Sequence, residues 1–333
     1  MRRPSSQAAL LRFLMSVLLL TLPVPSRAAD GTAATHPHFP TPALLTANVE
    51  FWKQIYSDFG VGDFVLHDRD NLGIIYDVVR VEEAKNQARA TALARPEIQR
   101  LREKYARILA DLSAGALPGD LGEDAVQVAQ LWGCPCSPDL LKRAAGSIRV
   151  QQGLREKVEE GIQRARGLMP RIVSILRRHE VPVELAALPL VESSFNPHAR
   201  SKAGAVGLWQ FIRSTGKRYL TISRRRDDRR DPIRATEAAA RFLRHNYEAL
   251  GSWPLAIIAY NHGPEGIQAA KAAVGSGAIE DIIAYYSGPR FGFASKNFYA
   301  EFLAALEIVR PLIGKHAPPH ETHTRPASAP KPS

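Results

Sequence analysis

Residues 184–192 have the sequence ELAALPLVE, a short apolar segment with an acidic residue at each end. A helix turns about 100° per residue, so Leu185, Leu188 and Glu192 fall on one face. Pro189 removes one backbone hydrogen bond, which makes this projection approximate. A carboxyl group on an apolar face is desolvated, which raises its pKa and keeps it protonated near neutral pH. Glu192 therefore suits a general acid, although a glutamate at a frayed helix end facing water fits this segment equally well.

A glycine-containing segment follows, in which residues 204–211 have the sequence GAVGLWQF. Glycine lets backbone segments approach closely, as they do in the wall of a cleft, but an ordinary loop also accommodates a Gly-x-x-Gly pair. Residues 193–226 contain no Asp or Glu. A second carboxylate for Glu192 would therefore have to come from a distant part of the chain.

Residues 252–264, SWPLAIIAYNHGP, predict a short, almost wholly apolar helix with Pro near its start and Gly-Pro at its end. Tyr260 and Asn261 at its C-terminal end need hydrogen-bond partners, which an open cleft or a substrate can supply. The alternative is a tyrosine satisfied within the core and an asparagine that caps the helix.

The rest of the chain is predicted to be mainly helical. Asp231 and Pro232 predict the start of a scaffold helix that ends at Gly251. The mixed-charge segment 224–230, RRRDDRR, favours a solvated loop with internal ion pairs over a site for a polyanion. Two β-rich runs, 64–67 and 73–79, indicate a hairpin. Further helical patterns cover residues 43–59, 81–112, 122–131, 138–145 and 152–178. Within 81–112, Pro96 either starts a second segment or kinks a single one.

The first 28 residues have the pattern of a secretory signal peptide, with arginines before an apolar run and small residues before the cleavage site. The apolar run is about ten residues, shorter than the roughly 20 that span a bilayer, which disfavours a permanent anchor. Cleavage would remove four arginines and no acid, lowering the formal charge from +11 to +7. A basic exported protein favours an acidic cell-wall polymer over nucleic acid as its partner.

Cys134 and Cys136 flank Pro135. Residues this close strain a disulfide, and two cysteines alone do not form a four-ligand zinc site. We expect them to be incidental.

Three motifs, taken in order, resemble one family: Glu192-Ser193 followed by Pro197, then G-x-x-G-L-x-Q over 204–210, then A-Y-N-x-G over 259–263. They are similar to the soluble lytic transglycosylase (SLT) domain of murein-cleaving enzymes, which belongs with goose-type lysozyme in the lysozyme-like superfamily. The segment 229–238 is most similar to the type D membrane-bound group. The resemblance covers about residues 165–312, without the lipid-attachment cysteine or C-terminal glycan-binding repeats of that group.

The resemblance implies a mainly α fold, with a lysozyme-like catalytic domain after a mostly helical N-terminal extension. Glu192 matches the sole catalytic acid/base, and Ser201 matches the serine that hydrogen-bonds its carboxyl. Four further residues match positions that bind the glycan: Gln210, Tyr260, Asn261 and Tyr299. The domains expected are a signal peptide (1–28), the extension (29–164), the catalytic domain (165–315) and a flexible, Pro-rich tail (316–333).

The reaction that the resemblance implies is cleavage of the β-1,4 bond between N-acetylmuramic acid and N-acetylglucosamine in peptidoglycan, without metal or organic cofactor. The muramoyl 6-hydroxyl attacks within the substrate and forms a 1,6-anhydro ring, which explains how one carboxylate can suffice. A muramidase that hydrolyses the same bond and a catalytically silent wall-binding scaffold are the alternatives. We expect a periplasmic protein that binds glycan strands, does not bind nucleic acid, and touches the membrane only through an uncleaved signal segment.

Overall fold

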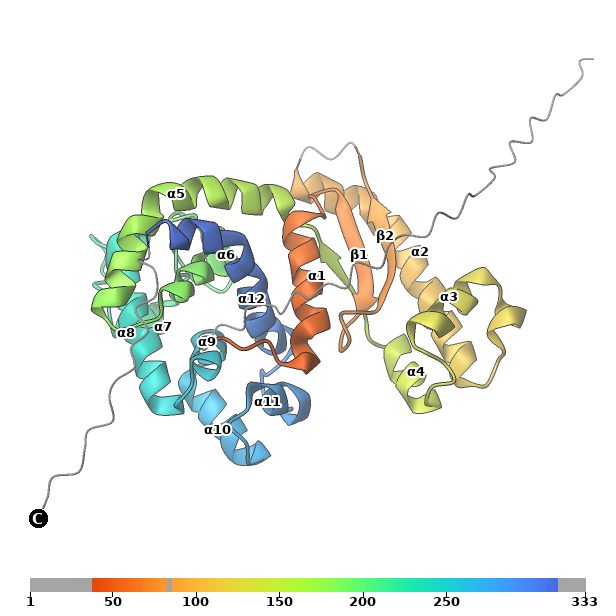
Figure 1. The fold of residues 1–333 in the computed structure, drawn as a ribbon. Coiled ribbons are helices and arrows are strands. Elements are labelled where there is room, and N and C mark those ends of the chain that lie inside the picture. The colour runs from red at the N-terminus through yellow and green to blue at the C-terminus, as the bar shows by residue number, and fades with distance from the viewer. Residues whose placement is uncertain (1–37, 83–85, 317–333) are drawn as a thin grey trace, which may run out of the picture. The chain divides into compact units, whose positions relative to one another are not determined.

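The computed structural model describes residues 38–82 and 86–316 (Figure 1). The expected signal peptide lies outside these residues, as does the expected tail apart from His316. The described part of the chain is mainly helical, as the sequence predicts. Within it, no helix combines the length and the apolar character needed to cross a membrane.

Each helical pattern before residue 180 corresponds to a helix whose ends differ by a few residues from those expected. Pro96 lies inside one continuous helix, α2, so it does not start a separate segment. These helices are α1 (Thr46–Ser57), α2 (Gln87–Ser113), α3 (Glu123–Leu131), α4 (Pro138–Ala145) and α5 (Arg155–Arg178).

The predicted hairpin is confirmed. Strands β1 (Asp63–Asp68) and β2 (Ile75–Arg80) pair antiparallel, with Phe64 opposite Val79. A third strand, β3 (Ile148–Gln152), was not predicted; it pairs on the other side of β1 and gives the order β2-β1-β3. Two of its five residues are glutamine, so its own pattern is a weak strand signal.

The second half of the chain is a set of helices that begins after a 3₁₀ turn over Val183–Ala187. Asp231 caps the helix that follows it by accepting hydrogen bonds from the amides of Ile233 and Arg234, and Gly251 ends that helix in the left-handed region, both as predicted. The helices are α6 (Leu188–Ser193), α7 (Arg213–Gly216), α8 (Pro232–Leu250), α9 (Trp253–His262), α10 (Pro264–Val274), α11 (Ile279–Tyr285) and α12 (Phe293–Gly314).

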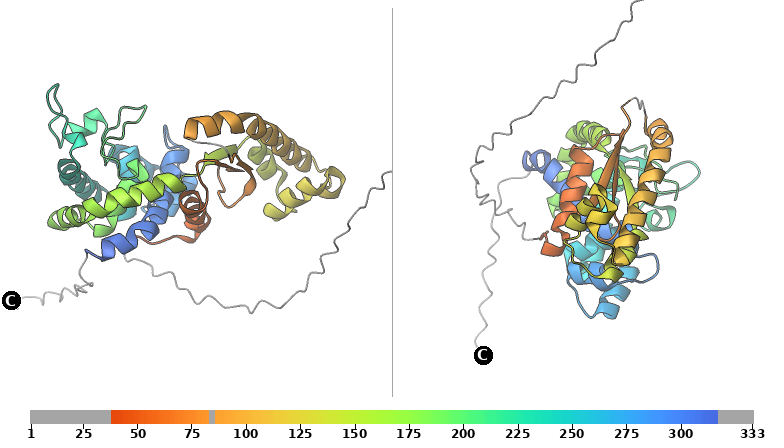
Figure 2. Two further views of the ribbon diagram at one scale, coloured as in Figure 1. Left: turned by 90° about the horizontal axis from the view of Figure 1, so that it is seen from above. Right: turned by 90° about the vertical axis from the view of Figure 1, so that its right-hand side faces the viewer.

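Two hydrophobic clusters form the core of the described part of the chain. One lies between a face of the sheet and helices α2, α3 and α4. The larger one joins the helices from α5 onward to α1, which packs against α12 (Figures 1 and 2). The expected boundary between residues 164 and 165 thus falls inside α5, and α1 shares a core with the expected catalytic domain. This packing brings a helix of the N-terminal extension close to the candidate site.

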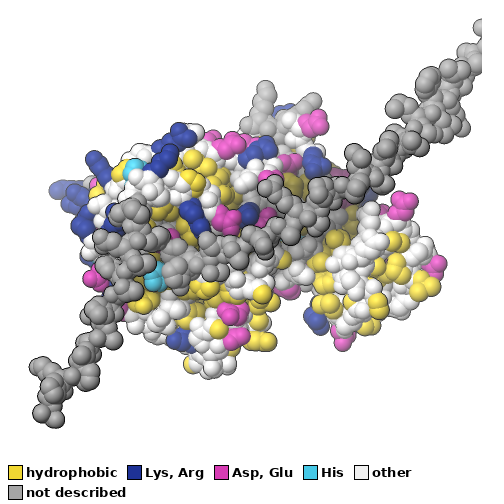
Figure 3. Space-filling model, viewed as in Figure 1, with side chains coloured by type: hydrophobic (Ala, Val, Ile, Leu, Met, Phe, Trp, Pro, Cys, Tyr) yellow, Lys and Arg dark blue, Asp and Glu magenta, His cyan; other side chains and the backbone are white. Residues whose placement is uncertain are grey.

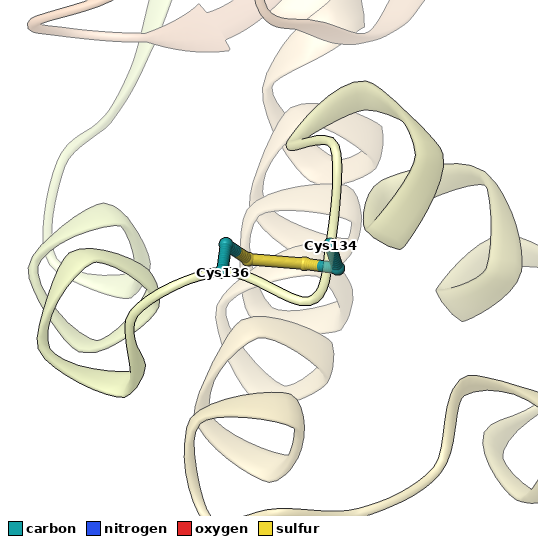
Figure 4. Close-up of a disulfide and its surroundings, with 2 residues drawn as sticks. All are labelled: Cys134 and Cys136. Atoms are coloured by element: carbon teal, nitrogen blue, oxygen red, sulfur yellow. A yellow bond between two sulfur atoms is a disulfide. The ribbon is translucent and has the colours of Figure 1, made fainter.

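The two cysteines are joined, contrary to expectation (Figure 4). Cys134 and Cys136 form a disulfide across a Cα–Cα distance of 4.3 Å. The peptide bond between Cys134 and Pro135 is cis. The expectation of incidental cysteines was wrong because the chain between α3 and α4 folds back on itself within three residues and places the two side chains face to face.

Candidate active site

Glu192 lies in the last turn of α6. The sequence predicted one helix from residue 184, but the structure has the 3₁₀ turn first and then a short α-helix, in which Pro189 occupies the first turn. A proline is tolerated there because the first amides of a helix have no partner within it. Leu185 and Leu188 are buried beneath this segment, while Glu192 is half-buried and lines a cavity.

That cavity has a volume of about 530 Å³. Two arginines, Arg218 and Arg290, and one further acid, Glu265, also line it. Five of the six residues that the resemblance pointed to meet there, although they come from three separate parts of the chain. They are Glu192, Ser201, Gln210, Tyr260 and Asn261.

A second cavity, of about 580 Å³, lies between the start of α1, the turn after β1, and α11 and α12. Its one carboxyl, Asp70, is paired with Arg69 at 2.9 Å. None of the six residues that the resemblance pointed to lines it. We therefore assign the chemistry to the slightly smaller cavity that holds Glu192.

Burial raises the pKa of Glu192 to about 8, and the charge of Glu301 on α12 adds to this rise. Within the described residues, neither an ion pair nor a hydrogen bond satisfies the Glu192 carboxyl. A desolvated carboxyl group without such partners keeps its proton through neutral pH. The expectation from the sequence, a protonated acid on an apolar surface, agrees with this geometry.

Ser201 shares the cavity with Glu192, but the two side chains are not hydrogen-bonded in this structure. The Ser201 hydroxyl oxygen instead accepts a hydrogen bond of 3.0 Å from the amide of Ala205. The Gln210 side-chain amide donates to the carbonyl of Gly207 at 2.9 Å. Both contacts stabilise the loop between α6 and α7, and leave the Ser201 proton available to a partner in the cavity.

The loop over residues 199–211 is pressed against the charged segment that precedes α8. Gly207 has a φ of +86°, and a Cβ there would lie 1.8 Å from the carbonyl oxygen of Arg229. The Arg229 guanidinium donates to the carbonyl of Phe211 at 3.1 Å and pairs with Asp227 at 2.7 Å. Only glycine fits at position 207, for both reasons.

This contact corrects part of the expectation for segment 224–230. Two of its ion pairs are internal, as expected, but Asp228 also pairs with Arg234 of α8. Asp228 and Arg229 are buried instead of solvated. Burial is tolerated because the donors of Arg229 find both a carboxylate and loop carbonyls, so little of its charge is left without a partner. The segment thus supports the wall of the cavity.

Three more hydrogen bonds fix the same loop. Buried Trp209 donates through Nε1 to Thr236 on α8 at 2.9 Å. The hydroxyl of Ser193, next to Glu192, donates to the carbonyl of Leu208 at 2.7 Å. The hydroxyl of Tyr260 donates to the carbonyl of Trp209, also at 2.7 Å. The loop is thereby tied to α6, α8 and α9, the elements that form the rest of the cavity.

Tyr299 is the predicted site residue that the structure does not bring into the cavity. Its side chain is fully buried, and its hydroxyl donates to the carbonyl of Pro40 at 2.8 Å. Asn261, by contrast, lines the cavity, and its side-chain oxygen accepts a hydrogen bond of 3.2 Å from Ser295. Tyr299 therefore connects α12 to the start of the described chain.

Two titratable groups near Glu192, the half-buried Glu301 and the buried Tyr56, were not predicted. Burial raises the pKa of Glu301 to about 8, and that of Tyr56 on α1 is raised far above its usual value by burial and by the charges of Glu301 and Glu192. Glu301 lies in an apolar stretch, as Glu192 does, so the same sequence signal could have found it. Residues 38–82 and 86–316 contain no group of three or more side chains arranged for a metal ion.

Comparison with known proteins places this geometry in a family. Residues 172–283 match the transglycosylase SLT domain. Membrane-bound lytic murein transglycosylase D of Escherichia coli K12 is 40% identical over 166 residues, which are 48% of this chain and 36% of that protein. Membrane-bound lytic murein transglycosylase F of Aeromonas salmonicida is 31% identical over 113 residues, 31% of this chain and 22% of that protein.

The crystal structure of the 70 kDa soluble lytic transglycosylase from Escherichia coli aligns with a TM-score of 0.36 at 15% identity, covering 68% of this chain and 45% of that one. The chain spans about a third of the length of the first curated relative, 36%. Glu192 and the four other predicted site residues that line its cavity all lie within the matched segment. Residues 172–283 are therefore a transglycosylase SLT domain, the domain of the lytic murein transglycosylases.

Proposed function

We propose that the protein is a peptidoglycan lytic transglycosylase that cleaves the β-1,4 bond between N-acetylmuramic acid and N-acetylglucosamine. The observation that carries the proposal is the carboxyl of Glu192, which lines the cavity without an ion-pair partner among the described residues and has a pKa raised to about 8. Such a group is protonated at neutral pH and can act as an acid first and as a base afterwards.

In the first step, Glu192 gives its proton to the glycosidic oxygen, and the bond from that oxygen to the anomeric carbon of the muramoyl residue breaks. The N-acetyl oxygen of the same sugar stabilises the positive charge that grows on the anomeric carbon. Tyr260 and Asn261, which line the cavity at the end of α9, would bind the sugars on either side of the bond. Ser201 turns its hydroxyl toward Glu192 once the carboxyl is ionised.

In the second step, ionised Glu192 takes the proton from the muramoyl 6-hydroxyl while its oxygen bonds to the anomeric carbon. The product is a 1,6-anhydro sugar, and water is not consumed. Attack from within the substrate has an effective molarity of up to about 10⁵ to 10⁸ M, so it outruns water when the sugar is held correctly. The many contacts that fix the 199–211 loop support such positioning.

The charge of the protein fits an acidic polymer. Arg218 and Arg290 line the cavity beside Glu192. On the face shown in Figure 3, many Lys and Arg side chains (dark blue) lie at the left, over the part of the molecule that holds α5 and α8. The carboxylates of peptidoglycan stem peptides would be attracted to such a surface. We propose export to the periplasm, where that polymer lies.

A muramidase that hydrolyses the same bond is the second candidate. Glu265 lines the same cavity, and a second carboxylate is what activation of a water molecule requires. The two reactions differ in their products, since the anhydro sugar is lighter than the hydrolysed one by one water.

The test is mass spectrometry of the fragments that the purified protein releases from sacculi. We expect anhydromuramoyl products from the wild type, none from Glu192→Gln, and unchanged product chemistry from Glu265→Gln. If the wild type releases products with reducing muramic acid ends, and Glu265→Gln does not, the protein is a muramidase and the proposal is wrong. Cleavage retained by Glu192→Gln would show that Glu192 is not the catalytic acid. A wild-type protein that binds glycan strands without cleaving them would favour the catalytically silent wall-binding scaffold.

A further inference from the structure

The second cavity, of about 580 Å³, has no part in the proposed chemistry, but two distant parts of the chain build it together. The expected N-terminal extension supplies Asn48 of α1 and the pair Arg69 and Asp70. The opposite wall consists of α11, the start of α12 and the segment between them. Of the residues that line it, only Ile283 lies in the segment 172–283 that matches the SLT domain. The cavity is therefore a feature of this chain beyond that domain.

The wall of the second cavity contains a cation without an acidic partner. Lys296, in the first turn of α12, is half-buried and forms no ion pair with any residue of 38–82 or 86–316. A cation near the N-terminal end of a helix is also unfavourably placed relative to the helix dipole. An anion bound in the cavity would neutralise this charge.

A second cation in the wall, Arg69, is paired but keeps free donors. Its Nε and Nη2 atoms donate to the carboxylate of Asp70 at 3.1 and 2.9 Å. Its Nη1 group makes no hydrogen bond with another described residue, so it can donate to a ligand. Because Arg69 and Asp70 neutralise each other, Lys296 gives the charged residues of the wall a net positive charge.

Two carboxamides complete the polar part of the wall. Asn48 donates through Nδ2 to Oδ1 of Asn297 at 3.1 Å, and buried Asn297 donates to the carbonyl of Phe293 at 3.0 Å. Asn297 thus fixes the orientation of Asn48. The side-chain oxygen and second N–H of Asn48 have no hydrogen-bond partner in the described part of the chain. An acceptor beside a donor is the complement of a peptide group.

The two cavities share a wall. Arg290 lines the cavity of the candidate active site, and the next residue, Phe291, lines the second cavity. The ring of Phe291 packs edge-on against His262 of the first cavity, with ring centroids 5.1 Å apart. Ser295 hydrogen-bonds to His262 and to Asn261, each at 3.2 Å. A ligand that leaves the first cavity over this wall enters the second one.

We propose that the second cavity binds the stem peptide of a glycan strand whose sugars lie in the candidate active site. The proposal rests on the function proposed above, which makes peptidoglycan the substrate. A stem peptide offers carboxylates to Lys296 and to the free donors of Arg69, and peptide groups to Asn48. Its aliphatic parts would cover Leu44, which is 56% exposed at the edge of the cavity. The N-terminal extension thus binds the peptide while the SLT domain cleaves the glycan.

The first test measures the binding of a synthetic stem peptide without sugar, so it does not depend on cleavage. ¹⁵N-labelled protein is titrated with the peptide and followed by NMR, and the side-chain amide signals of Asn48 should move. We expect Lys296→Gln to bind about tenfold more weakly, because one charge-assisted hydrogen bond is lost. Lys315→Gln, at the exposed far end of α12, is the control and should bind like the wild type. Equal binding by all three proteins, or no binding by the wild type, overturns the proposal.

A second variant, Ala284→Trp, removes space instead of charge. Ala284 lines the second cavity and is exposed on α11, so a larger side chain there is not forced into the core. We expect peptide binding to fall at least tenfold while the melting temperature stays that of the wild type. Peptide binding that survives this substitution would show that the peptide lies elsewhere, and the proposal would be wrong.

The third test compares cleavage of peptide-bearing strands with cleavage of the same strands after enzymatic removal of the peptides. For Lys296→Gln, we expect KM for peptide-bearing strands to rise about tenfold relative to KM for bare strands, whereas Lys315→Gln keeps the wild-type ratio. An equal change on both substrates would make Lys296 a sugar-binding residue and would overturn the proposal. A wild type that releases no anhydro product rejects the proposed function instead, and the peptide titration still decides on the second cavity.

Discussion

The hydroxyl of Tyr260 on α9 donates a 2.7 Å hydrogen bond to the backbone carbonyl of Trp209, in the loop on the opposite side of the cavity. Burial raises the pKa of the same tyrosine well above its usual value, and the charge of Glu192 adds to this rise. The Tyr260 side chain thus joins α9 to the loop across the cavity and lines the same cavity as Glu192. The link explains why the predicted motifs at 204–210 and 259–263, far apart in the sequence, act on one site.

Tyr260→Phe removes this link and keeps the ring. We expect a loss of about 1 kcal/mol in the free energy of unfolding, because one net hydrogen bond is lost. We also expect a fall in kcat/KM of about tenfold or more, because the loop is less well positioned. Denaturant unfolding and muropeptide release measure the two effects. Tyr285→Phe, at a side chain that is 75% exposed, is the control and should change neither.

Gly207→Ala should be strongly destabilising, by about 3 kcal/mol or more, because its Cβ would collide with the backbone of Arg229. The matched control is Gly204→Ala. Gly204 also has a positive φ, of +81°, but no atom lies within 4 Å of a Cβ there, so only the conformational cost of about 1 kcal/mol remains. Equal losses in chemical denaturation would show that the contact with Arg229 does not hold the loop.

The rate of cleavage should fall as the pH rises through about 8, where Glu192 loses its proton. The acid form is the active one in the first step, so activity is retained below this value until other groups titrate. Initial rates on sacculi between pH 5 and 10 give the midpoint. An alkaline limb near 4.5, the ordinary pKa of a glutamate, would mean that Glu192 is hydrated and ionised.

Glu192→Gln should make the protein more stable at neutral pH. The unfolded chain ionises Glu192 above about 4.5, but the folded protein keeps the proton up to about 8, so stability falls as the pH rises between these values. Glutamine does not ionise, and we expect a gain of about 1 to 3 kcal/mol at pH 7 that is nearly absent at pH 4. Thermal melting at both pH values measures it. A gain of the same size at pH 4 would point to packing instead of charge.

More of the candidate site than of the structure around it could be predicted from the sequence. Glu192 was recognisable because an acid in an apolar segment is uncommon, and Tyr260 and Asn261 because a buried helix ends in polar groups. Glu301 also lies in an apolar segment, but the residue predicted there was Tyr299, whose hydroxyl donates a hydrogen bond to the carbonyl of Pro40. Side-chain type alone did not separate the two, since burial depends on which helix covers which face.

Other features depend on contacts that no local pattern contains. The charged segment before α8 looks solvated in sequence, because the carbonyls that satisfy Arg229 belong to Gly204 and Phe211, in a different loop. Strand β3 is polar and forms only because β1 offers an open edge. The helices before residue 180, in contrast, were predicted to within a few residues of their ends, because the periodicity of apolar residues is itself local.

The packing of α12 has a practical consequence for anyone who would trim this protein. The segment shared with the family ends at residue 283, before α12 begins at Phe293. An excised fragment of that length would lose the helix that covers α6 and α9, together with α1. Its apolar interior would be exposed to solvent, and fragments with exposed apolar surface tend to aggregate during expression. A minimal folded unit should therefore run from α1 to the end of α12, because the matched segment is shorter than the part of the chain that shares one core.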